Sequence, residues 1–130
     1  MAKIAPGARG EYTLLVTGEV AIDFLGLDAG RVLSTPHMIG FMERTCRDTV
    51  LPLLDAGHDT VGTEVHVRHL AAAAIGSVVR FTAEVTAVDG RRIRFRVEAR
   101  NGEELIGDGT HERTVINVAK FAARMAQKQK

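Results

Sequence analysis

The sequence predicts an α+β domain in which an antiparallel sheet of about five strands covers one long helix. A stretch of roughly twenty residues in the first half of the chain carries apolar side chains at helical spacing, with Pro36 near its start. The residues that follow alternate apolar and polar side chains, as half-buried strands do. Asp89-Gly90 and Asn101-Gly102 are typical of the tight turns that join neighbouring antiparallel strands.

Composition favours a single domain over residues 1–130, with 45% hydrophobic residues. Seventeen Lys and Arg residues against sixteen Asp and Glu residues leave a formal charge of +1, which argues against a nucleic-acid-binding protein. The apolar stretches are far shorter than a membrane span, and the N-terminus lacks the apolar core of a signal peptide. We therefore expect a cytoplasmic protein without a membrane partner. Cys46 is the only cysteine, and it is expected to be a small buried residue.

The first predicted elements are a strand at Glu11–Thr17 and a helix from Thr35 to about Leu54. Thr35 fits the N-cap and Pro36 the first helical position. One side of the helix is apolar, and Arg44 and Asp48 lie on the opposite side. The residues expected on the apolar side are Ile39, Met42, Cys46, Thr49, Val50 and Leu53.

Four strands are expected after the helix, and residues 119–130 are expected to form a short terminal helix. The inner face of such a sheet can cover the apolar helix while its outer face meets water, which is the arrangement of the hot-dog fold. The strand residues expected to face the helix are Thr63, Val65, Val67 and His69, then Val79, Phe81, Ala83, Val85 and Ala87, then Ile93, Phe95, Val97 and Ala99. The last strand is expected at Glu104–Val118.

Glu43 is unusual because it falls inside the apolar side of the predicted helix, between Ile39 and Cys46. Burying an unpaired carboxylate is unfavourable, so Glu43 must find a hydrogen-bond partner, take up a proton or face a cavity. A catalytic acid or base explains this position. A glutamate at the edge of the apolar side, turned to solvent or paired with Arg47, explains it equally without chemistry.

His69 continues the face of Val65 and Val67 that is expected to point at the helix. A single inward histidine is usually a hydrogen-bonded core residue, whereas a histidine and a glutamate that converge form a candidate site. Thr35 lies at the start of the helix, where its hydroxyl either caps the helix or joins that site. We therefore take Thr35, Glu43 and His69 as candidate catalytic residues.

Other types of site find little support. His66 and His69 face opposite sides of a strand, so their spacing is poor for a metal ion, and no metal is expected. His37, His58 and His111 have no spacing that improves this. The sequence contains no Gly-x-Ser-x-Gly elbow, phosphate loop or dinucleotide fingerprint.

Three blocks stand out in chain order: Thr35–Glu43, Gly62–His69 and Gly107–Arg113, the last of which ends in Thr-His-Glu-Arg. Together they resemble the fluoroacetyl-coenzyme A thioesterase family of hot-dog proteins, over about residues 10–125. The resemblance implies a hot-dog fold, hydrolysis of an acyl-coenzyme A (acyl-CoA) thioester with no cofactor beyond the coenzyme A (CoA) of the substrate, and a homodimer with sites near the subunit interface.

The resemblance also implies roles for five residues. Thr35, Glu43 and His69 correspond to the family's catalytic threonine, glutamate and histidine. Gly62 and Arg113 correspond to a glycine and an arginine that help to position the substrate. The three catalytic positions are the ones already taken as candidates from the residue pattern and the helix start.

One segment departs from the family's pattern. The fluoroacetyl-selective enzyme has a longer segment before its catalytic threonine, which acts as a lid and shapes the acyl pocket. The corresponding segment here, Asp23–Leu33, is shorter, and Phe24 is its only aromatic residue. The resemblance therefore implies a thioesterase without implying selectivity for the fluoroacetyl group.

A row of arginines in the third strand after the helix has two interpretations. It is expected to be a solvated outer face. Guanidinium groups also suit the phosphates of CoA, and Arg68 and Arg113 are comparable candidates for that contact. Nucleic-acid binding by this row is the least favoured interpretation, because the net charge is balanced. The row consists of Arg92, Arg94, Arg96 and Arg100.

The expected reaction is thioester hydrolysis. Glu43 would attack the carbonyl carbon or activate a water molecule, His69 would transfer the proton, and Thr35 would donate a hydrogen bond. A non-catalytic module that binds acyl thioesters is the alternative, in which Glu43 and His69 only satisfy each other. A hot-dog dehydratase or hydratase is less favoured. Those enzymes pair an Asp with a His five residues later, and no Asp in this sequence has such a partner.

Overall fold

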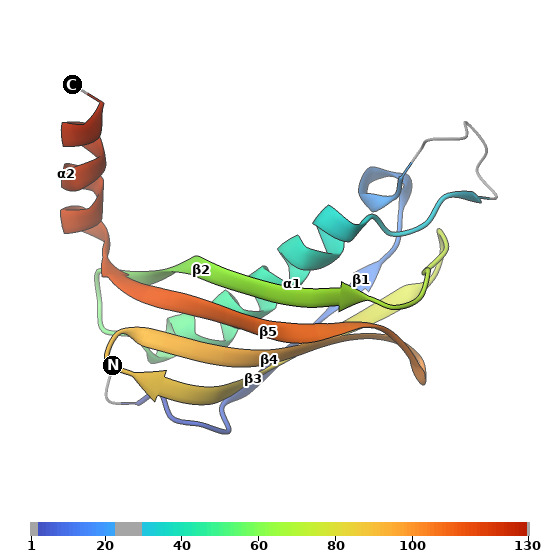
Figure 1. The fold of residues 1–130 in the computed structure, drawn as a ribbon, viewed down its shortest axis with the longest axis horizontal. Helices are drawn as coiled ribbons and strands as arrows, with labels where there is room; N and C mark the ends of the chain where they lie inside the picture. The colour runs from blue at the N-terminus through green and yellow to red at the C-terminus, as the bar shows by residue number, and fades with distance from the viewer. Residues whose placement is uncertain (1–2, 23–29, 130) are drawn as a thin grey trace.

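The computed structural model describes residues 3–22 and 30–129, and shows one antiparallel sheet against one long helix (Figure 1). The strand order is β1-β3-β4-β5-β2, so β1 and β2 are the edge strands. This confirms the predicted α+β architecture. The elements are β1 (Arg9–Leu15), η1 (Gly18–Val20), α1 (Thr35–Val50), η3 (Leu51–Leu53), β2 (His58–His69), β3 (Val78–Asp89), β4 (Arg92–Asn101), β5 (Glu104–Asn117) and α2 (Val118–Lys128).

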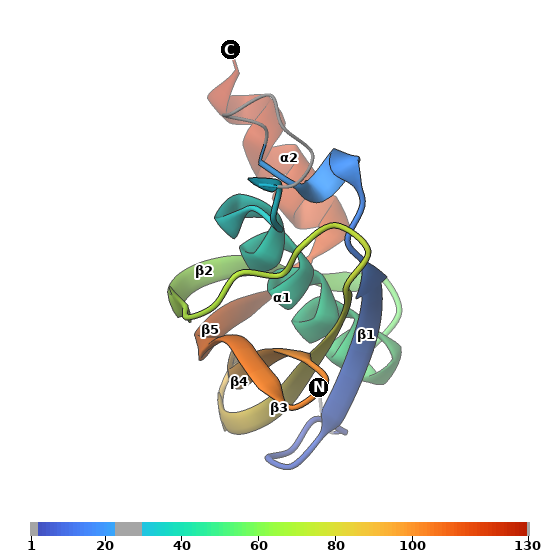
Figure 2. The same ribbon diagram turned by 90° about the vertical axis from the view of Figure 1, so that its right-hand side faces the viewer.

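The sheet curves around α1, which lies along its concave face (Figure 2). Inward-facing residues of β3 and β4 alternate with outward-facing ones and pack against the helix, as predicted up to Val85 in β3 and throughout residues 93–99 in β4. The expected inward position of Ala87 is wrong, because the register of β3 against β4 shifts between Val85 and Ala87, so that Ala87 is exposed and Val88 packs against the core. Gly90 and Gly102 take φ angles of 60° and 62°, which glycine adopts without a steric penalty and which the two hairpin turns require. The fully buried members of this face include Val79, Phe81, Val85, Ile93, Phe95 and Val97.

The start of α1 differs from the prediction by one residue. Ser34, not Thr35, is the N-cap, and its Oγ accepts a hydrogen bond from the backbone N–H of His37 at 3.2 Å. Thr35 is therefore the first helical residue and Pro36 the second. Because Ser34 satisfies the helix end, the hydroxyl of Thr35 is released for another contact.

The far end of α1 reflects the geometry of proline. The α-helix ends at Val50, and a 3-10 turn, Leu51–Leu53, completes the stretch that was expected to run to about Leu54. Pro52 lies in this turn. Its ring excludes a regular helical turn and it has no N–H to donate, so the α-helical hydrogen bonds stop before it.

The buried side of α1 is centred one residue earlier than expected. The row buried against the sheet is Met38, Met42, Cys46 and Val50, at a spacing of four residues. Ile39 is only half-buried. Arg44 and Asp48 are exposed, as predicted, and form an ion pair at 3.6 Å.

Strand β2 contains a bulge that the alternation rule did not predict. Its register against β5 shifts between Gly62 and Glu64, so Thr63 is the extra residue. The hydroxyl of Thr63 lies on the outer face, 2.9 Å from Oε2 of Glu112, so the expected inward position of Thr63 is wrong. The bulge changes the phase of the strand, and Gly62 and His69 both come to face the helix side.

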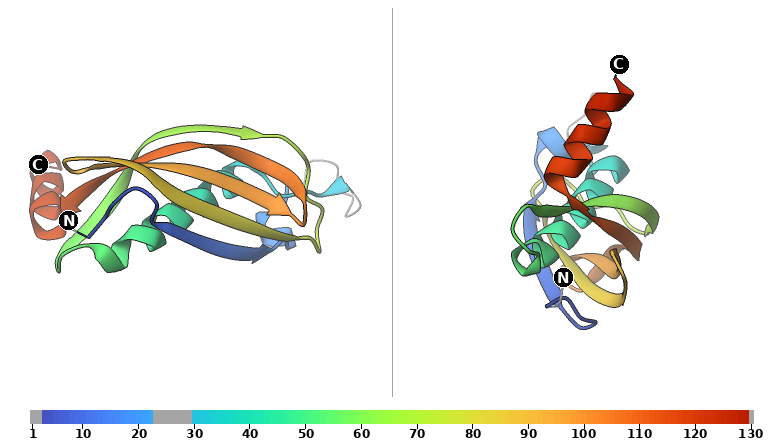
Figure 3. Two further views of the ribbon diagram at one scale, coloured as in Figure 1. Left: turned by 90° about the horizontal axis from the view of Figure 1, so that it is seen from below. Right: turned by 90° about the vertical axis from the view of Figure 1, so that its left-hand side faces the viewer.

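Helix α2 projects from one end of the sheet (Figure 3). None of its residues is fully buried, and its two large apolar side chains within residues 119–128, Phe121 and Met125, are half-buried. Asn117 caps it by accepting a hydrogen bond from the N–H of Lys120 at 3.1 Å. Within the described residues, no helix has the length and apolar character needed to cross a membrane.

Replacing Phe81 by alanine is predicted to lower the free energy of unfolding by about 3–5 kcal/mol, because its ring is fully buried and leaves a large cavity. Urea denaturation followed by circular dichroism measures this change. Phe121→Ala removes the same side chain from the half-buried surface of α2 and should lower stability far less. Equal losses in the two variants would contradict the assigned core.

Candidate active site

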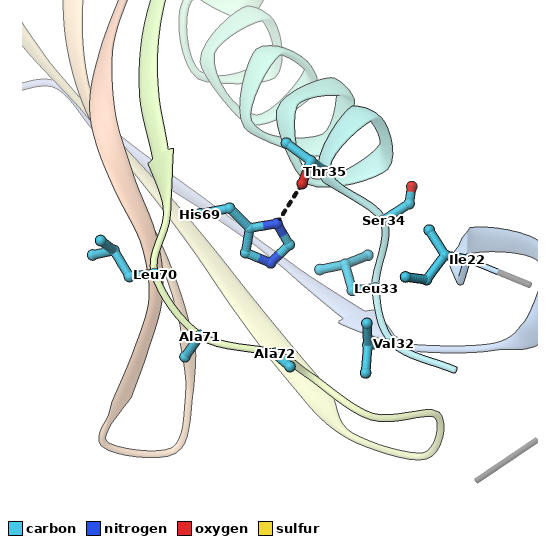
Figure 4. A pocket seen from close by; sticks show the side chains of 9 residues that line it. All are labelled: Ile22, Val32, Leu33, Ser34, Thr35, His69, Leu70, Ala71 and Ala72. Carbon is cyan, nitrogen blue, oxygen red and sulfur yellow. Dashed lines mark hydrogen bonds between the residues drawn. The ribbon is translucent and has the colours of Figure 1, made fainter. Parts of the chain in front are cut away.

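Thr35 and His69 meet where the start of α1 faces the end of β2 (Figure 4). Oγ1 of Thr35 and Nδ1 of His69 lie 2.7 Å apart, within hydrogen-bond distance. Nε2 of the same ring is buried and has no hydrogen-bond partner among residues 3–22 and 30–129. Leaving such a group unpaired is unfavourable by about 1–3 kcal/mol, so this nitrogen is suited to meet a bound molecule.

A cavity of about 370 Å³ adjoins this pair, and Figure 4 shows the histidine ring directed into it. Its lining is mostly apolar and includes small side chains, which leaves room for a short substituent beside the imidazole. The lining residues are Ile22, Val32, Leu33, Ser34, Thr35, His69, Leu70, Ala71 and Ala72.

Glu43 lies about two helical turns beyond Thr35, with its carboxylate against Gly62 of β2. A Cβ atom at position 62 would lie 3.1 Å from Oε1 of Glu43, closer than an ordinary contact, so a side chain there would displace the carboxylate by a few tenths of an ångström. Glu43 is half-buried and has no hydrogen-bond or ion-pair partner in the described part of the chain. The proposed pairing with Arg47 is wrong, because Arg47 binds Asp59 with 2.7 Å between Nη2 and Oδ2.

Arg113 and His111 support this corner from the neighbouring strand β5. Arg113 is buried and donates from Nε to Oγ1 of Thr60 at 2.7 Å and from Nη2 to the Thr60 carbonyl at 2.9 Å. Its Nη1 lies 3.1 Å from Nε2 of His111, whose Nδ1 lies 2.8 Å from the Glu64 carbonyl. An arginine donor and a carbonyl acceptor together fix one tautomer, with the proton of His111 on Nδ1.

The electrostatics of this corner follow from burial. Burial lowers the pKa of Arg113, while the negative charge of Glu43 acts in the opposite direction. Cys46 is fully buried, as predicted, and this burial raises the pKa of its thiol to about 12. Arg113 therefore supplies a positive charge next to Glu43, and Cys46 is not a nucleophile at neutral pH.

The two candidate groups do not meet within one chain. Thr35 and His69 line the first cavity, whereas Glu43 and Arg113 line a separate depression of about 410 Å³ together with Gly40, Arg44, Arg47 and Asp48. Glu43 and His69 therefore lie apart within one chain, whereas the sequence left open which subunit supplies each group. The physical reason is distance: Gly62, beside Glu43, and His69 are seven residues apart on an extended strand, a span of ~23 Å.

The arginine row lies on the outer face, and each of its members has a carboxylate partner. The ion pairs are Arg92 with Asp89 at 3.6 Å, Arg94 with Glu64 at 3.6 Å, Arg96 with Glu84 at 3.4 Å and Arg100 with Glu98 at 3.3 Å. Arg68 likewise pairs with Asp108 at 3.0 Å. These contacts support the interpretation of the row as a solvated face.

Sequence reasoning missed His111 and Thr60, which hold Arg113 in place. The alternation of His111, Arg113 and Val115 on one face of β5 contains the signal, because three buried positions share a period of two. No group of three or more His, Cys, Asp or Glu side chains that could hold a metal ion occurs within residues 3–22 and 30–129. The lid prediction at Asp23–Leu33 falls largely outside the described residues, and so does Phe24.

His111 predicts a pH dependence of stability. Burial lowers its pKa below the ordinary value of 6.5, so below that pH the unfolded chain binds a proton that the native His111 does not. Stability should therefore fall as the pH drops from 6.5 towards the lowered pKa. In urea denaturation across this window, His111→Gln should make the free energy of unfolding less dependent on pH, whereas His66→Gln, on the exposed face, should not. Identical slopes in wild type and His111→Gln would contradict this account.

Comparison with known proteins identifies the family. A family model described as fluoroacetyl-CoA-specific thioesterase matches residues 16–119. A fluoroacetyl-CoA thioesterase from Streptantibioticus cattleyicolor is 44% identical over 97 residues, which cover 75% of this chain and 70% of that protein.

Solved structures agree with this assignment. A variant of the fluoroacetyl-CoA thioesterase FlK in complex with acetyl-CoA is 34% identical, with a TM-score of 0.88 over 98% of this chain and 100% of that chain. A hypothetical protein of Thermus thermophilus, described as a thioesterase superfamily member, is 32% identical, with a TM-score of 0.89 over 99% and 96% of the two chains. The fold, the matched segment and these relatives show that the chain belongs to the fluoroacetyl-CoA-specific thioesterase family of hot-dog enzymes.

Proposed function

We propose that this protein hydrolyses short acyl-CoA thioesters at sites that two copies of the chain build together. The observation that carries the proposal is the unpartnered carboxylate of Glu43, held against Gly62 beside the buried charge of Arg113. The FlK complex with acetyl-CoA supports the substrate class. The small side chains of Ala71 and Ala72 beside His69 favour a short acyl group.

A homodimer formed through β2 would complete the site. Strand β2 is a sheet edge, whose unpaired backbone groups can bind a second strand. If it pairs antiparallel with its copy so that Gly62 lies opposite His69 of the partner subunit, Glu43 of one chain meets His69 of the other. Two-fold symmetry then makes two identical sites. Val65, 38% exposed near the centre of this register, would be covered.

Hydrolysis in this arrangement uses Glu43 as the base. A water oxygen adds to the thioester carbonyl carbon while one of its protons passes to the carboxylate. The C–S bond then breaks while Nε2–H of His69 of the partner subunit donates a hydrogen bond to the departing sulfur. The proton held by Glu43 passes to that sulfur, which restores the carboxylate and leaves the imidazole neutral. In the variant of this mechanism, Glu43 attacks the carbonyl directly, and water hydrolyses the resulting anhydride.

The other site residues position these groups. When the Thr35 hydroxyl donates to Nδ1 of His69, the ring proton resides on Nε2, where the thiolate needs it. Gly62 allows substrate and carboxylate to approach the backbone closely. All three nitrogens of the Arg113 guanidinium contact Thr60 or His111, so Arg113 acts on the substrate through its charge.

Selectivity and location are further parts of the proposal. The segment Asp23–Leu33, with Phe24 as its only aromatic residue, argues against strict selectivity for the fluoroacetyl group. The absence of a membrane-spanning helix among the described residues is compatible with a cytoplasmic enzyme. The non-catalytic module differs in one outcome, because it would bind CoA esters without releasing free CoA.

Glu43→Gln is predicted to lower kcat/KM for acetyl-CoA by a factor on the order of 10²–10⁴, since it removes the base while preserving shape. Release of free CoA, followed with a thiol reagent, measures the rate. Glu103→Gln, in the exposed β4–β5 turn, removes an equal charge and should retain activity. A folded Glu43→Gln variant with full turnover would refute the mechanism, and wild type that binds acetyl-CoA without turnover would favour the module.

Mixing two inactive variants tests the shared site. Glu43→Gln and His69→Ala homodimers each lack one group in both sites, whereas their heterodimer has one site with native Glu43 and native His69. Random exchange of subunits is therefore expected to restore about one quarter of wild-type activity.

The control for this experiment is Glu43→Gln mixed with itself through the same unfolding and refolding cycle, which should stay inactive. Sites confined to one chain would give no recovery in the mixture. A monomeric mass in solution at micromolar concentration would also contradict the shared site.

A further inference from the structure

Three cationic side chains, Arg91, Lys120 and Arg124, line a cavity of about 340 Å³ where β5 ends and α2 begins. We call them the α2 cation cluster. Lys120 and Arg124 are four residues apart and project from the same side of α2, and Arg91 comes from the turn between β3 and β4. None of the three has a carboxylate partner among the described residues, in contrast to the paired arginines of β4.

The same cavity offers two further groups suited to a nucleotide. The ring of Phe121 lines it, with the guanidinium carbon of Arg124 5.5 Å from the ring centroid. Asn117 also lines it and caps α2, so the partial positive charge of the helix start adds to the cluster. Cations, an aromatic face and a helix start in one cavity match a ligand that joins phosphates to a flat base.

We propose that the α2 cation cluster binds the phosphorylated adenosine diphosphate part of CoA. This inference rests on the proposed function, because it assumes an acyl-CoA substrate. Guanidinium groups bind phosphate oxygens in pairs, and a lysine adds a point charge. Three unpaired cations match the several negative charges of this part of the substrate, and Phe121 provides a surface on which adenine stacks.

The distance from Glu43 supports this assignment. Arg113, next to Glu43, and Asn117, in the cavity, are four residues apart on β5, which is ~14 Å along an extended strand. The pantetheine arm between the thioester and the diphosphate contains about as many chain atoms as four residues, and extends by ~14 Å. A thioester at Glu43 can therefore place its phosphates at the α2 cation cluster.

The test compares two triple variants that remove the same charge. Arg91→Gln/Lys120→Gln/Arg124→Gln removes the cluster, and Arg92→Gln/Arg96→Gln/Arg100→Gln removes three paired arginines of β4. Each is assayed with acetyl-CoA and with S-acetylpantetheine, which lacks the nucleotide. We expect the KM for acetyl-CoA to rise at least about tenfold in the cluster variant only, with an unchanged kcat. The KM for S-acetylpantetheine should stay within about twofold of wild type in both variants.

A titration with CoA itself decides the question without turnover, so a failure of the proposed hydrolysis is distinguishable from a failure of this site. Wild type should bind CoA at least about tenfold more tightly than the cluster variant, and the difference should shrink as salt screens the charges. Equal CoA affinity in wild type and the cluster variant would overturn the proposal. An equal rise of KM for both substrates, or the same effect in the β4 variant, would overturn it too, and thermal melts establish that both variants are folded.

Discussion

The bulge at Thr63 is the constraint on which the arrangement of this site depends. Gly62 and His69 are an odd number of residues apart, so an uninterrupted strand would direct them to opposite faces of the sheet. The extra residue shifts the phase once, and both positions then face α1. Gly62 can accommodate the carboxylate of Glu43, and His69 can reach the hydroxyl of Thr35. An irregularity of one residue thus places both halves of the site on the same side of an edge strand.

The carboxylate of Glu43 has no hydrogen-bond partner in the described chain, whereas the neighbouring guanidinium of Arg113 is hydrogen-bonded through all three of its nitrogens. Arg113 is buried and directs its nitrogens at Thr60 and His111, so its charge is present beside Glu43 without a direct ion pair. The distinction matters for chemistry, because a carboxylate in a bidentate ion pair has fewer lone pairs free to accept a proton or attack a carbonyl. Arg47 shows the contrasting case, since it is bound to Asp59 by two hydrogen bonds and serves structure.

The two halves of the site are incomplete in a way that an edge strand can resolve. The carboxylate of Glu43 has no partner in the described chain, and neither does Nε2 of His69. Both lie next to β2, whose outer edge is free in a single chain. Antiparallel pairing of β2 with β2 of a second chain would satisfy the unpaired backbone N–H and C=O groups of this edge. It would also bring Glu43 of one chain close to His69 of the partner subunit. The same geometry places the α2 cation cluster at the end of β5, one pantetheine length from Glu43.

The sequence by itself determined the order of elements, the hairpin turns and the inward face of β4 and of β3 as far as Val85, because hydrophobic period and turn chemistry are local properties. It also singled out Glu43 and His69 as polar groups at positions where apolar ones are expected, and Thr35 as a hydroxyl at the start of the helix on the same side. Only the tertiary structure decided that Ser34 caps α1, that Glu43 and His69 lie apart in one chain, and that His111 holds Arg113. Those outcomes depend on a bulge and on contacts between strands distant in sequence, and a periodic pattern carries no information about either.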